Sequence, residues 1–406
     1  MVLTREENER LTRVGPGTPA GELLRRYWHP IAIARELTPQ QPTRFVRLLG
    51  EDLVLFRDQA GRVGLLAHRC AHRGASLVYG RVEARGLACA YHGWLYDTAG
   101  NILETPPERN EAIIRHVKQR AYPVQQFLGL YWAYLGPPPP PVIPPYDTFV
   151  RKDGRRRIVV HPRLDCNWFQ AMENSVDPDH LQILHQEYIG RGKQPVNTTR
   201  GFIDDVASTD FYLVPYGIMK KRVYKNGLVE EHPLIFPNML RQGPSTQIRV
   251  PIDDTHTWHV HIIFEPTPDG REVEQADDEI PVEYREPYKQ PPDALYPEAR
   301  YTLQSVLAQD HMAWETQGPI ADRTQEHLSY SDRGIHLLRK LMKEQMERVQ
   351  QGLDPMGVIR DPHHPMIDTN LAGPGQGVWT ASHPAGIATP TVTVRETEER
   401  LTSRSY

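Results

Sequence analysis

The chain is short of cysteine and of long apolar segments. It has three cysteines in 406 residues, and its first residues, MVLTREENERLTRV, contain no apolar run of the kind a secretory signal needs. Cysteines in such a chain are more often metal ligands than disulfide partners, so we expect a cytoplasmic protein. The longest apolar run, residues 127–135, is too short to cross a bilayer, so we expect no membrane partner.

The chain also lacks a dominant charge and a nucleotide-binding fingerprint. Its formal net charge is −4, which does not favour nucleic acid as a partner. The sequence contains no glycine-rich dinucleotide or flavin motif. What remains is an ordinary globular composition, 39% apolar and 24% charged, and a length that suits two domains.

The pattern of the first third predicts a β-rich domain. Short strands are expected at 45–49, 53–56, 63–67 and 127–135. The run GPPPPPVIPPYD at 136–147 disfavours both helix and sheet and predicts a stiff connector. We therefore expect one domain over 1–140 and a second over 146–406.

The most specific signal is a pair of similar loops, CAHRG at 70–74 and CAYHGW at 89–94. Each supplies one cysteine and one histidine: Cys70 and His72, then Cys89 and His92. Mixed zinc sites usually group like ligands together in the sequence, which this pattern does not. One thiolate and one imidazole per loop suit a [2Fe–2S] cluster in which two thiolates hold one iron and two imidazoles the other.

A second metal motif follows the connector, in ENSVDPDHLQILH at 173–185. Two imidazoles and a carboxylate on one side of a metal are the ligand set of non-haem Fe(II) oxygenases, and this segment offers both His180 and His185. The residue before a proline disfavours helix, so the helix predicted at 168–174 should break at Asp177-Pro178. Histidines five apart lie about 140° apart on a regular helix, which predicts a distortion between them.

The rest of the second domain predicts sheet and helices. Strands are expected at 155–162, with exposed arginines at a solvated edge, and at 211–218, 221–232 and 248–264, with a hairpin turn at Asn226-Gly227. The last strand puts His259 and His261 on one face; we do not favour a metal site for them and His256, because strand histidines usually pack or meet solvent. Helices are expected at 297–318 and after Asp332.

Together the two motifs resemble those of the Rieske non-haem iron aromatic-ring-hydroxylating oxygenases, in particular the catalytic α subunit. The run CAYHGWLYD is near that family's usual wording, and VPIDDTHT resembles its phthalate dioxygenase-like branch. The respiratory Rieske proteins differ, because they carry a further cysteine in each loop and a membrane anchor. The resemblance implies an α+β fold: an N-terminal all-β Rieske [2Fe–2S] domain followed by a helix-grip-like catalytic domain of antiparallel sheet and helices.

By the same resemblance the site residues are assigned as follows. The cluster is held by Cys70, His72, Cys89 and His92. The mononuclear Fe(II) is held by His180, His185 and Asp310, with Glu315 as the second choice for the carboxylate. Asp177 links an iron histidine to a cluster histidine of a neighbouring subunit, with Asp179 as its rival, and Asn174 lies near the iron.

The implied function is O₂-dependent cis-dihydroxylation of a small aromatic substrate, expected to be a carboxylate. Electrons come from an NADH-dependent flavin and iron–sulfur reductase, and the subunits form a homotrimer or homohexamer. Candidate arginines and lysines for the carboxylate are Arg241, Arg249 and the cluster at 220–222. Two other functions stay open: O-demethylation or monooxygenation at the same iron, and a non-catalytic Rieske electron carrier.

Overall fold

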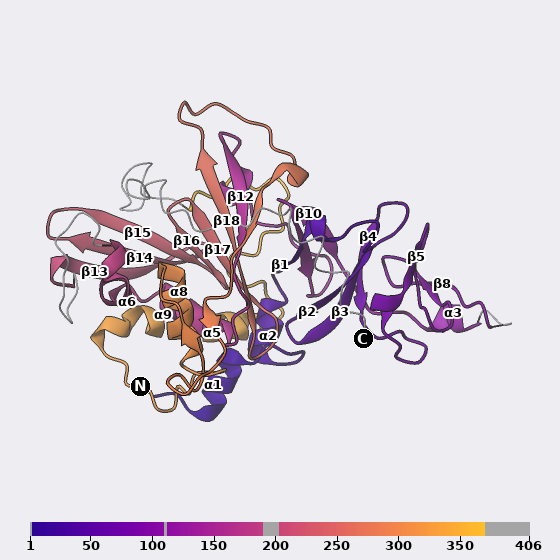
Figure 1. Cartoon of the computed structure of the whole chain (residues 1–406), viewed down its shortest axis with the longest axis horizontal. Coiled ribbons are helices and arrows are strands. Elements are labelled where there is room, and N and C mark those ends of the chain that lie inside the picture. Colours follow the sequence, from indigo (N-terminus) through magenta and orange to yellow (C-terminus); the bar gives the residue numbers. More distant parts are fainter. Residues whose placement is uncertain (1, 109–111, 190–202, 370–406) are drawn as a thin grey trace.

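The computed structural model describes residues 2–108, 112–189 and 203–369. They form two β-rich halves, with most of the helices gathered on the second (Figure 1). The expected α+β fold is confirmed: a first domain of small sheets, then a second of one large sheet with helices. No helix in these ranges is long and apolar enough to cross a membrane.

The first domain contains three small antiparallel sheets. One joins β2 (Thr43–Leu48), β3 (Glu51–Arg57), β4 (Val63–Ala67) and β9 (Ala121–Tyr122). A second joins β1 (Trp28–Ile33), β11 (Leu130–Tyr134) and β10 (Val124–Phe127). The third joins β5 (Arg81–Glu83), β6 (Gly86–Ala88), β7 (Leu95–Tyr96) and β8 (Ile102–Glu104), and lies with α3 (Ala112–His116) at the end of the molecule farthest from the other helices (Figure 1).

The second domain is built on an eight-stranded sheet in the order β13-β14-β15-β16-β17-β18-β12-β19. The strands are β12 (Gly154–Val160), β13 (Val206–Val214), β14 (Gly217–Tyr224), β15 (Val229–Ile235), β16 (Met239–Gln242), β17 (Ser245–Pro251), β18 (Thr257–Pro266) and β19 (Val282–Tyr284). All neighbours are antiparallel except β12 and β19. The basic strand β12 lies one strand in from the edge of this sheet, because β19 pairs with its outer side.

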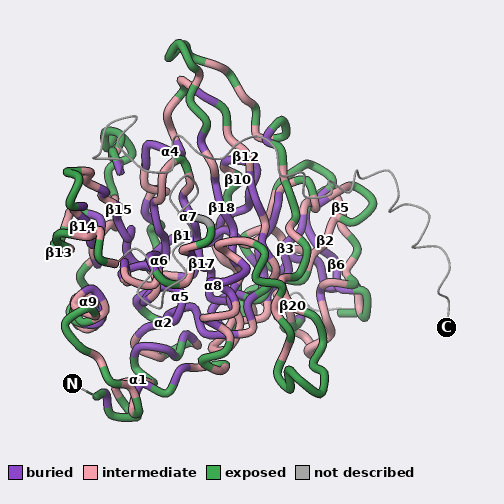
Figure 2. The backbone as a smooth tube through the Cα atoms, turned by 60° about the vertical axis from the view of Figure 1, so that its left-hand side comes forward, coloured by how far each residue is buried: buried purple, intermediate pink, exposed green. Residues whose placement is uncertain are grey.

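Helices cover the sheet around a central one, α5 (Trp168–Ser175), which touches β16 and β17. The others in this domain are α4 (Asp147–Val150), α6 (Asp179–Leu184), α7 (Gln186–Ile189), α8 (Val306–Glu315) and α9 (Arg333–Gln350). The N-terminal helices α1 (Arg5–Thr12) and α2 (Pro19–Leu24) also pack here, against α9. Buried backbone accordingly gathers around α5, α8 and β17, whereas the loop beside β20 (Lys289–Gln290), which pairs with β21 (Arg300–Tyr301), is exposed (Figure 2).

The apolar core divides unequally between the domains. One large cluster runs from Trp132 of β11 to Trp168 of α5 and on into α9, so most of the first domain shares its core with the second. A separate apolar cluster joins the far end of the first domain, residues 70–104 and α3, called the tip below, to strands β3 and β4, and contains Cys70, Cys89 and Trp94. The tip therefore has its own hydrophobic support. The boundary placed between residues 140 and 146 stays a prediction.

Three predicted elements are shorter or divided. The strand at 127–135 is the hairpin β10–β11, turned at Leu128 and Gly129, whose φ angles are both positive. The strand at 248–264 is the hairpin β17–β18. The helix at 297–318 is reduced to α8, because residues 300–301 pair as β21 and the Ser305 hydroxyl accepts from Ala308 N–H at 3.1 Å to cap the helix start.

Candidate metal centres

Two loops of the tip place the four cluster candidates together. In each loop the glycine four residues after the cysteine donates its N–H to the cysteine carbonyl, Gly74 to Cys70 at 2.8 Å and Gly93 to Cys89 at 2.9 Å. Both glycines have φ +73°, a conformation that costs other residues steric strain. The two loops are therefore the same turn, used twice.

The donor set of the tip fits a [2Fe–2S] cluster. Cys70 and Cys89 are buried, whereas the rings of His72 and His92 are partly exposed, 4.6 Å apart between centroids. The Cys70 Sγ lies 3.0 Å from the Tyr96 hydroxyl, and His72 stacks on Trp94. Burial raises the pKa of the Cys70 thiol, so a thiolate at this place needs a cationic partner such as iron. The arrangement puts sulfur inside and imidazole outside.

A second group, in the other domain, brings His180, His185 and Asp310 together. The Asp310 Oδ1 lies 3.1 Å from His185 Nε2 and 3.6 Å from His180 Nε2. Ligands roughly 2.1 Å from one metal and at right angles to each other lie about 3 Å apart, so this spacing fits a mononuclear metal. His185 is fully buried, and its other nitrogen, Nδ1, meets Gln309 Oε1 at 2.8 Å, which orients the ring.

The backbone around these histidines is interrupted, as predicted. Helix α5 ends before Asp177-Pro178, and Asp177 Oδ1 accepts the N–H of Asp179 at 2.9 Å to start α6. Helix α6 ends at Leu184, and His185 lies at the junction with α7, at φ −102° and ψ 15°. This distortion turns His185 toward His180 and toward α8. Although burial opposes ionisation of Asp310, the two histidines lower its pKa, so the group holds a carboxylate.

The remaining candidates take different places. Asp177 Oδ2 lies 3.5 Å from His180 Nδ1, and its side chain is 31% exposed, so it joins a metal-site histidine to the surface. Asn174 lies in the last turn of α5, and its carbonyl accepts the Asp177 N–H at 3.0 Å. Glu315 lies elsewhere on α8, paired with Lys289 Nζ at 2.9 Å. Within the described residues, the carboxylate that approaches the His180 ring is that of Asp177, and not that of Asp179.

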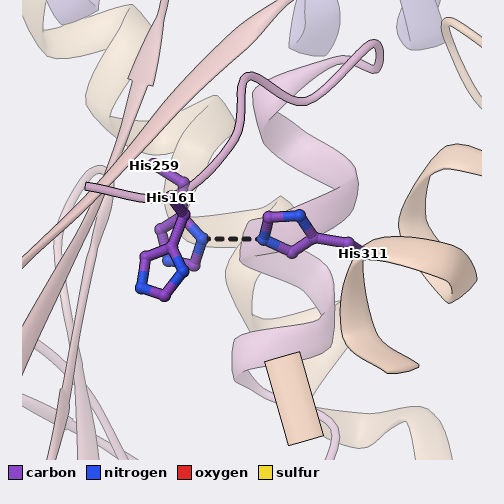
Figure 3. A group of neighbouring side chains, drawn as sticks. All are labelled: His161, His259 and His311. Carbon is purple, nitrogen blue, oxygen red and sulfur yellow. Dashed lines mark hydrogen bonds between the residues drawn. The ribbon is translucent and has the colours of Figure 1, made fainter. Parts of the chain in front are cut away.

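A third group was not predicted as a unit. His259 and His261 of β18 do share a buried face, but they meet His161, just after β12, and His311 of α8 (Figure 3). The His259 Nδ1 lies 3.1 Å from His311 Nε2, and His261 Nε2 lies 2.9 Å from His259 Nε2. The sequence gives no spacing signal for a group whose members are so far apart along the chain.

The arginines and lysines considered as partners for a substrate carboxylate differ in whether the protein already pairs them with an acidic side chain. Arg241 is paired with Asp147 at 3.0 Å, and Arg222 is paired with Glu230. Lys220 donates to the carbonyl of Ser175 at 3.1 Å. Arg249, which is 1% exposed, donates Nη2 to the amide oxygen of Gln247 at 2.7 Å, and this partner carries no charge.

Comparison with known proteins gives a consistent answer. Residues 27–127 match the family model of the Rieske [2Fe-2S] domain, and residues 233–370 match that of the LigXa C-terminal domain like family. The chain is 40% identical over 372 residues to the 5,5'-dehydrodivanillate O-demethylase oxygenase subunit of Sphingobium sp. (strain NBRC 103272 / SYK-6), covering 89% of this chain and 84% of that one.

Two further likenesses agree with these. The phthalate 4,5-dioxygenase oxygenase subunit of Pseudomonas putida is 31% identical over 395 residues, covering 88% of this chain and 89% of that one. The solved structure of NdmA from Pseudomonas putida CBB5 superposes with a TM-score of 0.60 at 22% identity, covering 86% of this chain and 100% of that one, and shows the fold. The chain therefore belongs to the Rieske non-haem iron oxygenases as an oxygenase subunit, in the branch of the phthalate and dehydrodivanillate enzymes.

Proposed function

We propose that this subunit oxidises an aromatic carboxylate with O₂ at the group of His180, His185 and Asp310. The observation that carries the proposal is the geometry of this group, two imidazoles and one carboxylate converging in a chain that also holds a Rieske site. Such a ligand set occupies one side of an Fe(II) ion and leaves the opposite positions for O₂ and substrate.

The protein groups around the metal have distinct tasks. His180, His185 and Asp310 would hold the iron, which would supply O₂ activation with electrons from the cluster. Gln309 fixes the tautomer of His185 by contacting Nδ1, so that Nε2 is left to face Asp310 and the metal. Cys70, His72, Cys89 and His92 hold the cluster, with the imidazoles at its outer edge.

Electron supply in this proposal comes from outside the chain. The cluster loops belong to the tip, at the opposite end of the molecule from α6 and α8 (Figure 1). We therefore propose that a neighbouring copy's cluster serves this iron in a homotrimer or homohexamer. The exposed edge of Asp177, whose other side faces His180, is the contact point. An oxygenase subunit requires an electron-transfer partner, and we propose an NADH-dependent flavin and iron–sulfur reductase.

Two reactions at the iron compete, and the relative with 40% identity favours O-demethylation. One oxygen atom enters a methyl C–H bond, and the resulting hemiacetal breaks into a phenol and formaldehyde. The second oxygen atom leaves as water with two electrons and two protons. cis-Dihydroxylation, our expectation from the sequence, is the second candidate, favoured by similarity to the phthalate enzyme.

The test is product analysis with ¹⁸O₂ and a reductase, on a panel of methoxylated and unsubstituted aromatic acids. Formaldehyde in step with O₂ uptake supports O-demethylation, and a diol carrying both labelled atoms supports dihydroxylation. A non-catalytic carrier would hold about two irons per chain in place of about three. Full turnover after both His180 and His185 are replaced by alanine would contradict the proposal.

A further inference from the structure

A buried polar row crosses the sheet beneath α8. Arg249 of β17 lies directly opposite His259 of β18 in the strand register. His161, one residue beyond β12, donates its backbone N–H to the His259 carbonyl at 3.0 Å and continues the row. Side chains directly opposite on neighbouring strands lie on one face, about 5 Å apart at Cβ. The three side chains therefore lie on one face of the sheet. Helix α8 contacts this face through His311, whose ring lies beside His259 and His161 (Figure 3).

The guanidinium in this row is buried with unused donors. Arg249 is 1% exposed, and within the described residues its Nε and Nη1 have no hydrogen-bond partner. Its other contacts are the neutral amide of Gln247 and the face of Trp314, 5.6 Å away. The opposite charge that acts on it comes from Asp310, which is itself engaged with His185. A buried cation in this state is costly unless an anion arrives to pair with it.

The imidazoles beside Arg249 are held neutral. Burial lowers the pKa of His161, His259 and His261 well below the ordinary value. A neutral imidazole still donates one N–H. His161 is 4% exposed and contacts the Tyr288 hydroxyl through Nδ1 at 3.0 Å, whereas its Nε2 is buried without a partner in the part of the chain described.

Three imidazoles this close could instead hold a metal ion, because one nitrogen from each of His161, His259 and His311 lies within 4.8 Å of the others. Charge argues against it. Neutral imidazoles leave a divalent ion with its full charge, directly beside the Arg249 cation in a buried site. The mononuclear group is built differently, with a carboxylate among its ligands. The surface is therefore suited to an anion.

We propose that Arg249 and His161 bind the carboxylate of the aromatic substrate, with His259 completing the surface between them. The assignment rests on the proposed function and deepens it. Asp310 and His311 are neighbours on α8, one in the metal group and the other in contact with the row, and Asp310 is also the opposite charge that acts on Arg249. The unpartnered Nε and Nη1 leave Arg249 with buried N–H donors that a carboxylate can accept from.

The experiment measures binding and does not need turnover. The probes are benzoate, phthalate, 3-methoxybenzoate and 4-hydroxy-3-methoxybenzoate, each matched with its neutral amide, titrated calorimetrically into the iron-loaded protein. We expect at least one acid to bind roughly tenfold or more tightly than its amide. R249Q should remove that difference and leave amide binding unchanged, R249K should keep part of it, and H161Q should weaken it less. Arg157, a partly exposed residue of β12 that pairs with Glu265, supplies the control variant R157Q, which should bind as the native protein does.

Stability separates recognition from support of the fold. Without ligand, R249Q should melt at the same temperature as the native protein or higher, because an uncompensated buried charge has been removed. A marked fall in Tm together with unchanged acid binding would overturn the proposal. So would a panel in which no acid binds more tightly than its amide.

Two further outcomes distinguish the proposals. Zn²⁺ retained beyond the iron content and lost in H161Q would overturn the anion site in favour of a metal site. Neutral aromatics oxidised without dependence on Arg249 would overturn this inference and leave the oxygenase function intact. Acid binding that depends on Arg249 but yields no product would support the inference and count against the proposed reaction.

Discussion

The two metal centres of this chain are built in opposite ways. The cluster site lies at the tip, on two copies of one turn backed by a small apolar cluster, and its four proposed ligands fall within residues 70–92. The mononuclear group lies in the body and joins His185 to Asp310, 125 residues apart. A site made by local turns depends mainly on its own loops, whereas one assembled from distant helices depends on the packing of the whole domain.

The variant C89S is expected to have the largest effect, because it should remove one metal centre and leave the other in place. Loss of one thiolate should remove the cluster, with its visible spectrum and about two irons per chain, and abolish turnover. The mononuclear iron should stay, because its ligands belong to the other domain. Metal analysis and absorbance measure this. The matched control is C166S, which changes the buried cysteine of the body and should keep the cluster; loss of both metals in C89S would show that the regions are coupled.

The variant D310N is expected to have the opposite effect, loss of the mononuclear iron with the cluster retained. The amide cannot supply the charged ligand, so iron content should fall by about one per chain and turnover should be lost, while the cluster spectrum stays normal. Electron paramagnetic resonance of the reduced cluster, together with iron analysis, measures both halves. On the same helix, E315Q is the control, because Glu315 pairs with Lys289 and should not affect iron content. Iron lost in E315Q and kept in D310N would reverse our choice of carboxylate.

The connection between the regions is tested by D177N. We expect a fall in turnover of roughly 10–100-fold with both metal contents unchanged, because the carboxylate that approaches His180 Nδ1 is lost while the iron ligands remain. The rate at which substrate reoxidises the reduced cluster measures the step directly. D179N is the matched control and should reoxidise at the native rate. Equal effects of the two variants would remove the special role of Asp177.

The smallest effect on turnover, but a clear one on stability, is expected from E173Q. Glu173 is buried and accepts from Arg323 and Arg339 at 2.6 and 2.7 Å, which joins α5 to α9. Removing its charge should lower the free energy of unfolding by roughly 3–5 kcal/mol. E344Q, at an exposed pair on α9, should cost less than about 1 kcal/mol.

The same carboxylate predicts a pH dependence. Burial raises the pKa of Glu173, but the two arginines outweigh it and hold the pKa below the ordinary carboxyl value. Its contribution to stability is therefore complete above that ordinary value, near pH 4.5, and is lost as pH falls toward the lower folded value. Denaturant unfolding between pH 6 and 3 should show this loss in the native protein and a smaller one in E173Q.

Much of this was predictable where the signal is local. The paired Cys and His loops, the break at Asp177-Pro178 and the hairpin turn at Asn226-Gly227 all depend on residues close in sequence, and the structure has each of them. Local rules fail where tertiary pairing decides. Leu128 takes a positive φ that its side chain disfavours, so the turn after β10 gave no signal.

The polar row shows the same limit at a site. The alternation of β18 placed His259 and His261 on one face, but nothing in the sequence says that His161 and His311 meet them there. Likewise, Arg249 could not be told from Arg241 until Asp147 was seen to neutralise the latter. Whether an arginine is satisfied is decided by its neighbours in space, and spacing along the chain does not report them.

The two matching turns at the tip bear on what happens to the protein when the cluster is lost. Each is closed by a backbone hydrogen bond and rests on apolar side chains, and neither kind of contact involves iron. Small zinc domains, by contrast, unfold when their metal leaves. We therefore expect a subunit that loses its cluster to oxidative damage to stay folded, with both loops able to bind a new cluster.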